Sequence, residues 1–147
     1  MHTSLKLNEC QVWLQLLDQP LPTEALLAEI QDVDCGAHLM FLGKARRRTA
    51  ERITTTLYYQ AYESMALSQL QSLATTATAQ WPLRQLRIIH RLGEVPIGQT
   101  SIAIAAASPH RPAVMEAIPW LMDQIKESVP IWKRETFADG TEQWIHP

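Results

Sequence analysis

The chain has 147 residues, of which 46% are hydrophobic and 19% are charged, and its formal net charge is −2. This composition favours a single domain, residues 1–147, with a packed core, and it argues against a disordered chain. No apolar run reaches the roughly 18–20 residues of a membrane-spanning helix, and the N-terminus lacks a signal-peptide pattern, so we expect a cytoplasmic protein without membrane association.

Residues 1–42 are expected to form a short strand, an apolar patch, a helix and a buried strand. Alternating apolar residues favour the strands, and acidic residues in the first helical turn suit the helix dipole. In chain order these are a strand at 5–7, the apolar patch at 12–17, a helix at 24–31 and a strand at 37–42.

Residues 43–52 form a strongly basic stretch that contains Lys44, Arg46, Arg47, Arg48 and Arg52. The β-branched and aromatic residues that follow, at 53–59, predict a strand. Because this strand comes soon after the one at 37–42, we predict a long hairpin with a basic tip. Such a tip suits a phosphate, or a polyanion such as RNA, although no aromatic residues are interleaved with its basic ones.

Two long helices are predicted in the remainder of the chain. Apolar residues at helical spacing predict the first at 64–80, and the second begins at residue 108 or 111, ends near 126 and contains Pro119, which should kink it. Strands are expected at 86–90 and 100–107, and a final hairpin at 131–137 and 143–145. Paired strands separated by two long helices favour an α+β fold with a mostly antiparallel sheet.

Basic side chains gather around the second long helix, in the part of the chain that is richest in them. Residues 44–134 hold twelve of the thirteen Lys and Arg residues but only six of the fifteen acids. His110 and Arg111 stand at the predicted helix N-terminus, where backbone N–H groups attract anions. Lys126 lies near its C-terminal end, where partial burial would favour acid–base chemistry. The plainer alternative is that all three are ordinary surface residues.

The segment after this helix adds Lys133, Arg134 and Glu135. In an extended strand, neighbouring side chains point to opposite faces, so only one of the two cations can share a pocket with Lys126. We expect Lys133 in that position, with Glu135 on the same face and able to move protons. Arg134 then lies nearby on the other face.

The sequence offers no other catalytic centre. The two cysteines, Cys10 and Cys35, have neither redox nor zinc spacing, and the five histidines are scattered. Glycine-rich nucleotide loops are missing as well. We therefore expect neither a metal nor a cofactor.

Six short motifs, in order and with matching spacing, resemble the large, catalytic subunit of molybdopterin synthase. They cover about residues 36–145. The motifs are Phe41-Leu42-Gly43-Lys44-Ala45-Arg46; Leu57-Tyr58-Tyr59-Gln60-Ala61-Tyr62; Trp81-Pro82-Leu83; Ile89-His90-Arg91-Leu92-Gly93; Ser108-Pro109-His110-Arg111; and Pro130-Ile131-Trp132-Lys133-Arg134-Glu135, followed by Asp139-Gly140 and Trp144.

The resemblance implies an α/β hammerhead-type fold and a homodimer. Each subunit would bind one small ubiquitin-like sulfur carrier, giving a heterotetramer. The carrier's C-terminal Gly-Gly tail, as a thiocarboxylate, would enter the active site and transfer sulfur to cyclic pyranopterin monophosphate, forming the dithiolene of molybdopterin. Sulfur that arrives on a partner removes the need for a nucleophilic cysteine.

The same resemblance implies roles for individual residues. Lys126 would be the principal acid–base group, assisted by Lys133 and Glu135. His110 and Arg111 would hold the substrate phosphate in the same pocket, with Arg46 reaching in and Arg134 nearby. The contrasting hypotheses are a non-catalytic basic module that binds RNA or another polyanion through residues 44–52, and an inactive scaffold subunit, against which the intact basic residues argue.

Overall fold

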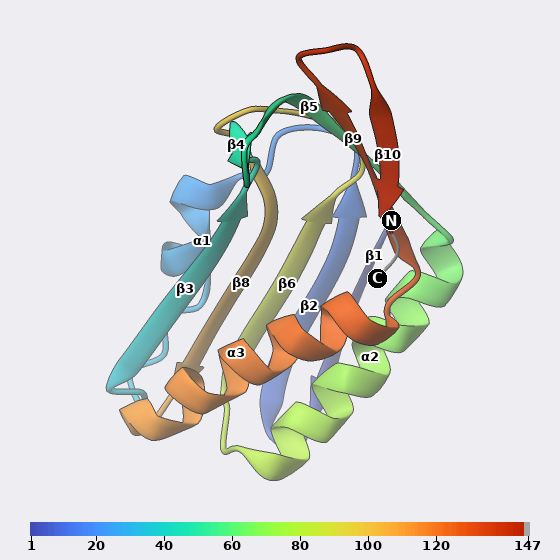
Figure 1. Ribbon diagram of the computed structural model, residues 1–147. Coiled ribbons are helices and arrows are strands. Elements are labelled where there is room, and N and C mark those ends of the chain that lie inside the picture. Colours follow the sequence, from blue (N-terminus) through green and yellow to red (C-terminus); the bar gives the residue numbers. More distant parts are fainter. Residues whose placement is uncertain (146–147) are drawn as a thin grey trace.

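The computed structural model describes residues 1–145, which form two β-sheets and three helices (Figure 1). The first sheet has the order β1 (His2–Leu7), β2 (Cys10–Leu17), β6 (Gln85–Arg91), β8 (Thr100–Ser108), β3 (Ala37–Lys44). The second runs β10 (Glu142–Ile145), β9 (Ile131–Phe137), β5 (Arg52–Ala61), β4 (Arg48–Thr49), and β7 (Gly93–Pro96) also pairs with β5. Within these residues only β2 and β6 pair in parallel, so the predicted α+β, mostly antiparallel fold is confirmed.

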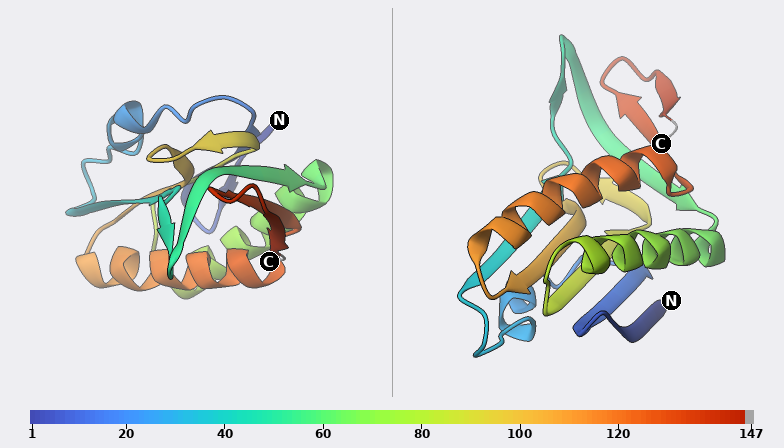
Figure 2. Two further views of the ribbon diagram at one scale, coloured as in Figure 1. Left: turned by 45° about the horizontal axis from the view of Figure 1, so that its top comes forward. Right: turned by 90° about the horizontal axis from the view of Figure 1, so that it is seen from below.

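The first sheet is covered on both faces. Helices α2 (Glu63–Gln80) and α3 (Arg111–Ser128) lie on one face, and the short α1 (Thr23–Glu29) lies on the other (Figures 1 and 2). Strand β8 shows why both faces are apolar: Ile102 and Ile104 pack in the core beneath α2 and α3, whereas Ala103 and Ala105 pack in the core beneath α1. Small residues on alternate positions let helices approach the strand closely.

Helix α3 begins directly after His110 and continues across Pro119 to Ser128. Its start and length agree with the prediction from the sequence, and the proline does not interrupt it. Proline can stand in its first turn because the N–H groups there have no intrahelical partner. None of the helices in residues 1–145 has the length and hydropathy to cross a membrane.

The predicted hairpin between residues 37–42 and 53–59 is wrong. Strand β3 pairs with β8, and β5 pairs with β9, so the two strands lie in different sheets. The register of β3 shifts between Gly43 and Lys44, and the next residue, Ala45, is buried. Its N–H donates a hydrogen bond to the carbonyl oxygen of Gln99, and its carbonyl oxygen accepts one from the N–H of Gly98. The chain therefore leaves the first sheet at this point and enters the second, and only the small β4–β5 hairpin remains of the predicted one.

Candidate functional site

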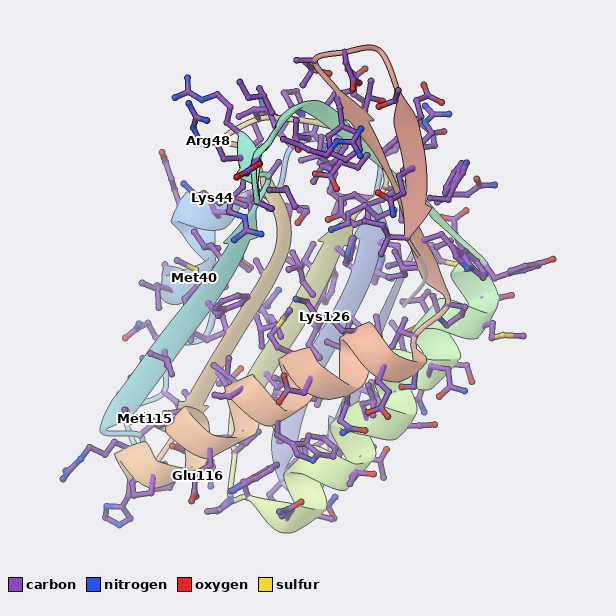
Figure 3. The ribbon with its side chains drawn as sticks, viewed as in Figure 1. Met40, Lys44, Arg48, Met115, Glu116 and Lys126 are labelled. Atoms are coloured by element: carbon purple, nitrogen blue, oxygen red, sulfur yellow. The ribbon has the colours of Figure 1, made fainter. Side chains whose placement is uncertain are left out.

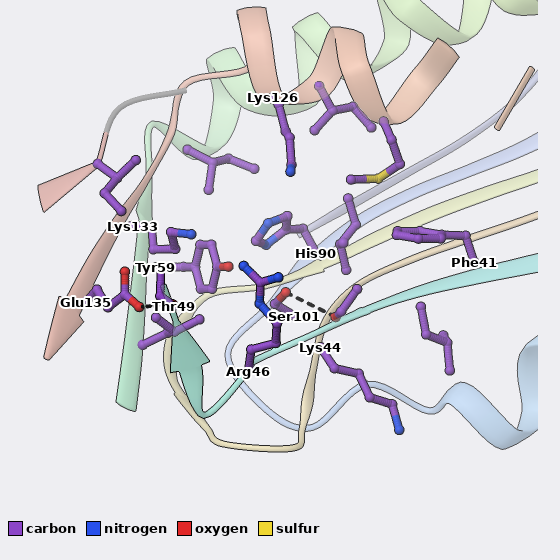
Figure 4. Close-up of a pocket in the computed structure, with 18 residues that line it drawn as sticks. Phe41, Lys44, Arg46, Thr49, Tyr59, His90, Ser101, Lys126, Lys133 and Glu135 are labelled. Carbon is purple, nitrogen blue, oxygen red and sulfur yellow. Dashed lines mark hydrogen bonds between the residues drawn. The ribbon is translucent and has the colours of Figure 1, made fainter. Parts of the chain in front are cut away.

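A cavity of about 580 Å³ lies where α3 meets the two sheets (Figure 4). Its wall contains four cations, a group of neutral polar side chains with one carboxylate, and an apolar part from α3 and the strands. The cations are Lys44, Arg46, Lys126 and Lys133; the other polar residues are Thr49, Tyr59, His90, Ser101 and Glu135; the apolar part includes Phe41, Met122, Ile125 and Ile131. A concave, partly apolar site with a few converging polar groups is the usual form of a small-molecule site.

Three of the cations enter the cavity from different elements. Lys126 comes from the last turn of α3, Lys133 from β9, and Arg46 from the segment between β3 and β4. Figure 4 shows Lys126 and Arg46 pointing toward the middle of the cavity from opposite sides, while Lys44 points away. The Lys126 side chain is exposed rather than partly buried, contrary to expectation. These cations make the cavity suited to an anionic ligand.

Glu135 is the buried carboxylate of the site, with only 4% of its surface exposed. The hydroxyl of Thr49 donates a hydrogen bond of 2.9 Å to its Oε1, and the hydroxyl of Thr54 donates a second to the same oxygen. A buried carboxylate needs such donors, because water no longer supplies them. The two threonines thus fix the position of this carboxylate against the cavity wall.

Strand alternation separates Arg134 from its two neighbours. Lys133 and Glu135 line the cavity, whereas the Arg134 guanidinium lies 4.8 Å from the Tyr58 ring centroid and 5.6 Å from that of Trp144. Tyr58 and Trp144 face Arg134 directly across β5 and β10. Arg134 therefore belongs to an aromatic row on the other face of the second sheet, where a cation–π arrangement holds it.

His110 and Arg111 do not line this cavity. His110 directly precedes α3 and Arg111 is its first residue, and both are exposed, whereas Lys126 is in the last turn of the helix (Figure 3). At about 1.5 Å per residue, the helix places Arg111 and Lys126 about 22 Å apart along its axis. A single chain therefore does not unite these residues in one pocket, contrary to the arrangement expected from the sequence.

The structure adds three residues to which the sequence assigned no role in the site: Tyr59, His90 and Ser101. The Tyr59 ring packs edge-on against the His90 ring, with centroids 4.8 Å apart. Burial raises the pKa of Tyr59, and a hydrogen bond with Ser101 acts in the opposite direction. Burial lowers the pKa of His90 to about 4, and its backbone hydrogen bond to Arg91 opposes that change. The one sequence signal for these residues was a tyrosine and a histidine at positions of predicted strands that face inward. Such residues usually have a structural role, so this signal did not predict that they line a cavity.

Neither cysteine belongs to the cavity. Both are buried, and burial raises the pKa of the Cys10 thiol to about 12 and also raises the pKa of Cys35. Both thiols are therefore protonated at neutral pH and poor nucleophiles. Within residues 1–145, no group of three His, Cys, Asp or Glu side chains is arranged to hold a metal ion.

Comparison with known proteins gives consistent matches. The family model described as "MoaE protein" matches residues 16–128. A molybdopterin synthase catalytic subunit from Bacillus subtilis is 37% identical over 131 residues, which cover 89% of this chain and 83% of that protein. One from Drosophila willistoni is 38% identical over 133 residues, but they cover only 36% of that longer protein, so the chain spans about a third of such relatives.

The solved structures agree with the sequence matches. The structure of molybdopterin synthase from Staphylococcus aureus superimposes with a TM-score of 0.83 at 32% identity and covers 90% of this chain and 96% of that one. A complex of subunits 1 and 2 of molybdopterin-converting factor from Helicobacter pylori has the same fold, with a TM-score of 0.70 at 23% identity over 90% of this chain and 88% of that one. With a family model matched over more than half of its length, the chain belongs to the MoaE protein family.

Proposed function

We propose that this chain, as one domain over residues 1–147, is the catalytic subunit of a molybdopterin synthase. It transfers sulfur from the thiocarboxylated C-terminus of a small carrier protein to cyclic pyranopterin monophosphate and so forms the molybdopterin dithiolene. Its relatives and its fold support this assignment. The observation that carries it is a cavity with converging cations and no thiol.

The absence of a cavity thiol agrees with a sulfur atom that arrives on another protein. Both substrates of the proposed reaction are anionic, since one carries a phosphate and the other ends in a thiocarboxylate. Lys126, Lys133 and Arg46 supply the opposite charge from three directions. Catalysis by such a site rests on holding the two reactants together and on stabilising negative charge as the carbon–sulfur bond forms.

Each lining residue has a distinct role in this proposal. Lys126 binds the incoming carrier terminus and exchanges protons with the reacting groups, because its ammonium points into the middle of the cavity (Figure 4). Lys133 assists from β9. Glu135 balances the cluster of cations, and its threonine donors keep it in place. Arg46 contacts the substrate phosphate.

His110 and Arg111 require a second subunit if they bind the same substrate, because α3 separates them from Lys126. We propose a homodimer in which the first turn of α3 of one subunit contributes these residues to the cavity of the other. Mixing two inactive variants, Arg111→Ala and Lys126→Ala, tests this arrangement. In an equal mixture, about half of the dimers contain one subunit of each variant, and one of the two sites in such a dimer is intact. About a quarter of the wild-type activity should therefore return. No return of activity would contradict sharing between subunits.

A carrier partner is supported by the solved Helicobacter pylori complex, which contains both subunits of its converting factor. For this chain, we propose a carrier with a flexible C-terminal Gly-Gly tail. Glycines suit a tail that enters a cavity because they lack side chains and adopt extended conformations without strain. The expected cytoplasmic location stays a prediction.

The test of the activity is reconstitution with a thiocarboxylated carrier and cyclic pyranopterin monophosphate. Wild-type protein should form the dithiolene product, and Lys126→Ala should not, although its exposed position leaves the fold intact. Lys6→Ala is a matched control, because Lys6 is an exposed lysine that does not line the cavity and whose ammonium lies 3.6 Å from the carboxylate of Glu9. Normal turnover by Lys126→Ala, or salt-sensitive RNA binding without carrier binding, would contradict the proposal.

A further inference from the structure

The His90 ring forms part of the cavity wall although 93% of its surface is buried. It lies on β6 between the Lys126 ammonium and the Arg46 guanidinium, with Tyr59 beside it (Figure 4). Burial disfavours the charged form of the imidazole and lowers its pKa to about 4. The surroundings of His90 therefore keep it neutral in a site that otherwise attracts anions.

The structure also determines the tautomer of this neutral ring. Nδ1 lies 2.8 Å from the backbone carbonyl oxygen of Arg91, and a carbonyl oxygen only accepts hydrogen bonds. Nδ1 therefore carries the proton, and Nε2 carries a lone pair and accepts. Among residues 1–145, no side chain or backbone group donates to Nε2.

The orientation of the ring is fixed from a second side. Tyr59 packs edge-on against His90 with an interplanar angle of 70°, and the Tyr59 hydroxyl interacts with Ser101 on β8. Ser101 in turn donates a hydrogen bond of 3.2 Å to the carbonyl oxygen of Gly43. Contacts through β5, β8 and β3 thus fix the His90 ring and, with it, the position of the Nε2 acceptor. Fixed acceptors of this kind are used for recognition, since a ligand that cannot donate to them leaves them unpaired.

A reduced pterin ring carries an amino group and ring N–H groups, all of them hydrogen-bond donors, whereas its phosphate offers only acceptors. The cations of the cavity suit the phosphate but cannot accept from the ring. We infer that His90, through Nε2, is the residue that accepts a hydrogen bond from an N–H of the substrate's heterocycle and so distinguishes the pyranopterin from other small phosphates. This inference rests on the proposed function and adds the group that recognises the ring.

Two variants separate the acceptor from the rest of the ring. His90→Asn keeps a donor near Nδ1 for the Arg91 carbonyl and removes the Nε2 acceptor. His90→Gln places an amide oxygen near the Nε2 position. Dissociation constants are measured for cyclic pyranopterin monophosphate and, as a ligand without a ring, for inorganic phosphate. The loss of one neutral hydrogen bond should weaken pyranopterin binding by His90→Asn by roughly 3–10-fold, with little loss in His90→Gln and no change for phosphate.

Equal pyranopterin affinity of wild type and His90→Asn, or an equal loss for both ligands, would overturn the inference. Wild-type protein that neither binds nor converts the pyranopterin would instead contradict the proposed function. A measurement on the wild type alone avoids the risk that a variant misfolds. The ¹⁵N resonance of His90 Nε2 should shift toward that of a hydrogen-bonded nitrogen when pyranopterin is added but not when phosphate is added, and an unchanged resonance with bound pyranopterin would refute the contact.

Discussion

Replacing His90 by Gln tests whether folding keeps this imidazole neutral. Burial lowers its pKa from the usual 6.5 to about 4. Each unit of pKa corresponds to about 1.4 kcal/mol of preference for one protonation state, so the change is worth about 3 kcal/mol. The side chain is 7% exposed, so screening by solvent reduces this figure little.

The sign follows from the two pKa values. Below pH 6.5 the unfolded chain takes up a proton at His90, whereas the folded chain does so only near pH 4. The unfolded state therefore binds more protons in this window, and the stability contributed by neutral His90 is lost as the pH falls through it. Above pH 6.5 the contribution is fully present.

Urea denaturation of the wild type and of His90→Gln, at about pH 7.5 and about pH 4, provides the measurement. Other titrating groups affect both proteins alike, so the difference between their free energies of unfolding isolates His90. Relative to the variant, the wild type should lose about 3 kcal/mol between the two pH values. A difference that changes by less than about 0.5 kcal/mol would show that the folded protein does not exclude the proton, and the reasoning would be refuted.

Three further predictions concern the framework of the site. Thr54→Val removes a hydroxyl that donates to buried Glu135 and should lower the free energy of unfolding by about 1–3 kcal/mol, whereas Thr55→Val, at the exposed neighbouring position, should change it by less than about 1 kcal/mol. Gly43→Ala places a Cβ 2.8 Å from a β8 side chain and should cost about 1–3 kcal/mol in the same urea assay; unchanged stability would contradict the close β3–β8 packing. Cys10, with a pKa raised to about 12 and no exposed surface, should react with a thiol reagent only after unfolding, and rapid labelling of native protein would refute its burial.

The helices, and the face of β9 to which each side chain points, could be predicted from the sequence because both depend on local patterns. Helical spacing identified α2 and α3 to within a few residues, and alternation placed Lys133 and Glu135 on one side of β9 with Arg134 on the other. Pairing between strands could not be predicted in the same way. The strands before and after the basic stretch are close in sequence, but each finds its partner far along the chain, in β8 and β9.

The neutral part of the site was also out of reach of the sequence. Thr49, Tyr59 and Ser101 are ordinary strand residues, and only the meeting of β4, β5 and β8 around one cavity gives them a common role. The separation of Arg111 from Lys126, by contrast, could have been predicted. A helix of 18 residues is about 27 Å long, which already excludes one small pocket formed by both of its ends in a single chain.

Because β9 pairs with β5 in a fixed register, alternate residues of β9 decide which functional groups line the cavity. Lys133 stands opposite Tyr59 and Glu135 opposite Leu57, and all four side chains line the cavity. A slip of one residue would turn every side chain of β9 over. It would replace an amine and a carboxylate by a single guanidinium, without changing the composition of the strand. A one-residue deletion just before β9 should therefore disrupt the cavity far more than most substitutions within the strand.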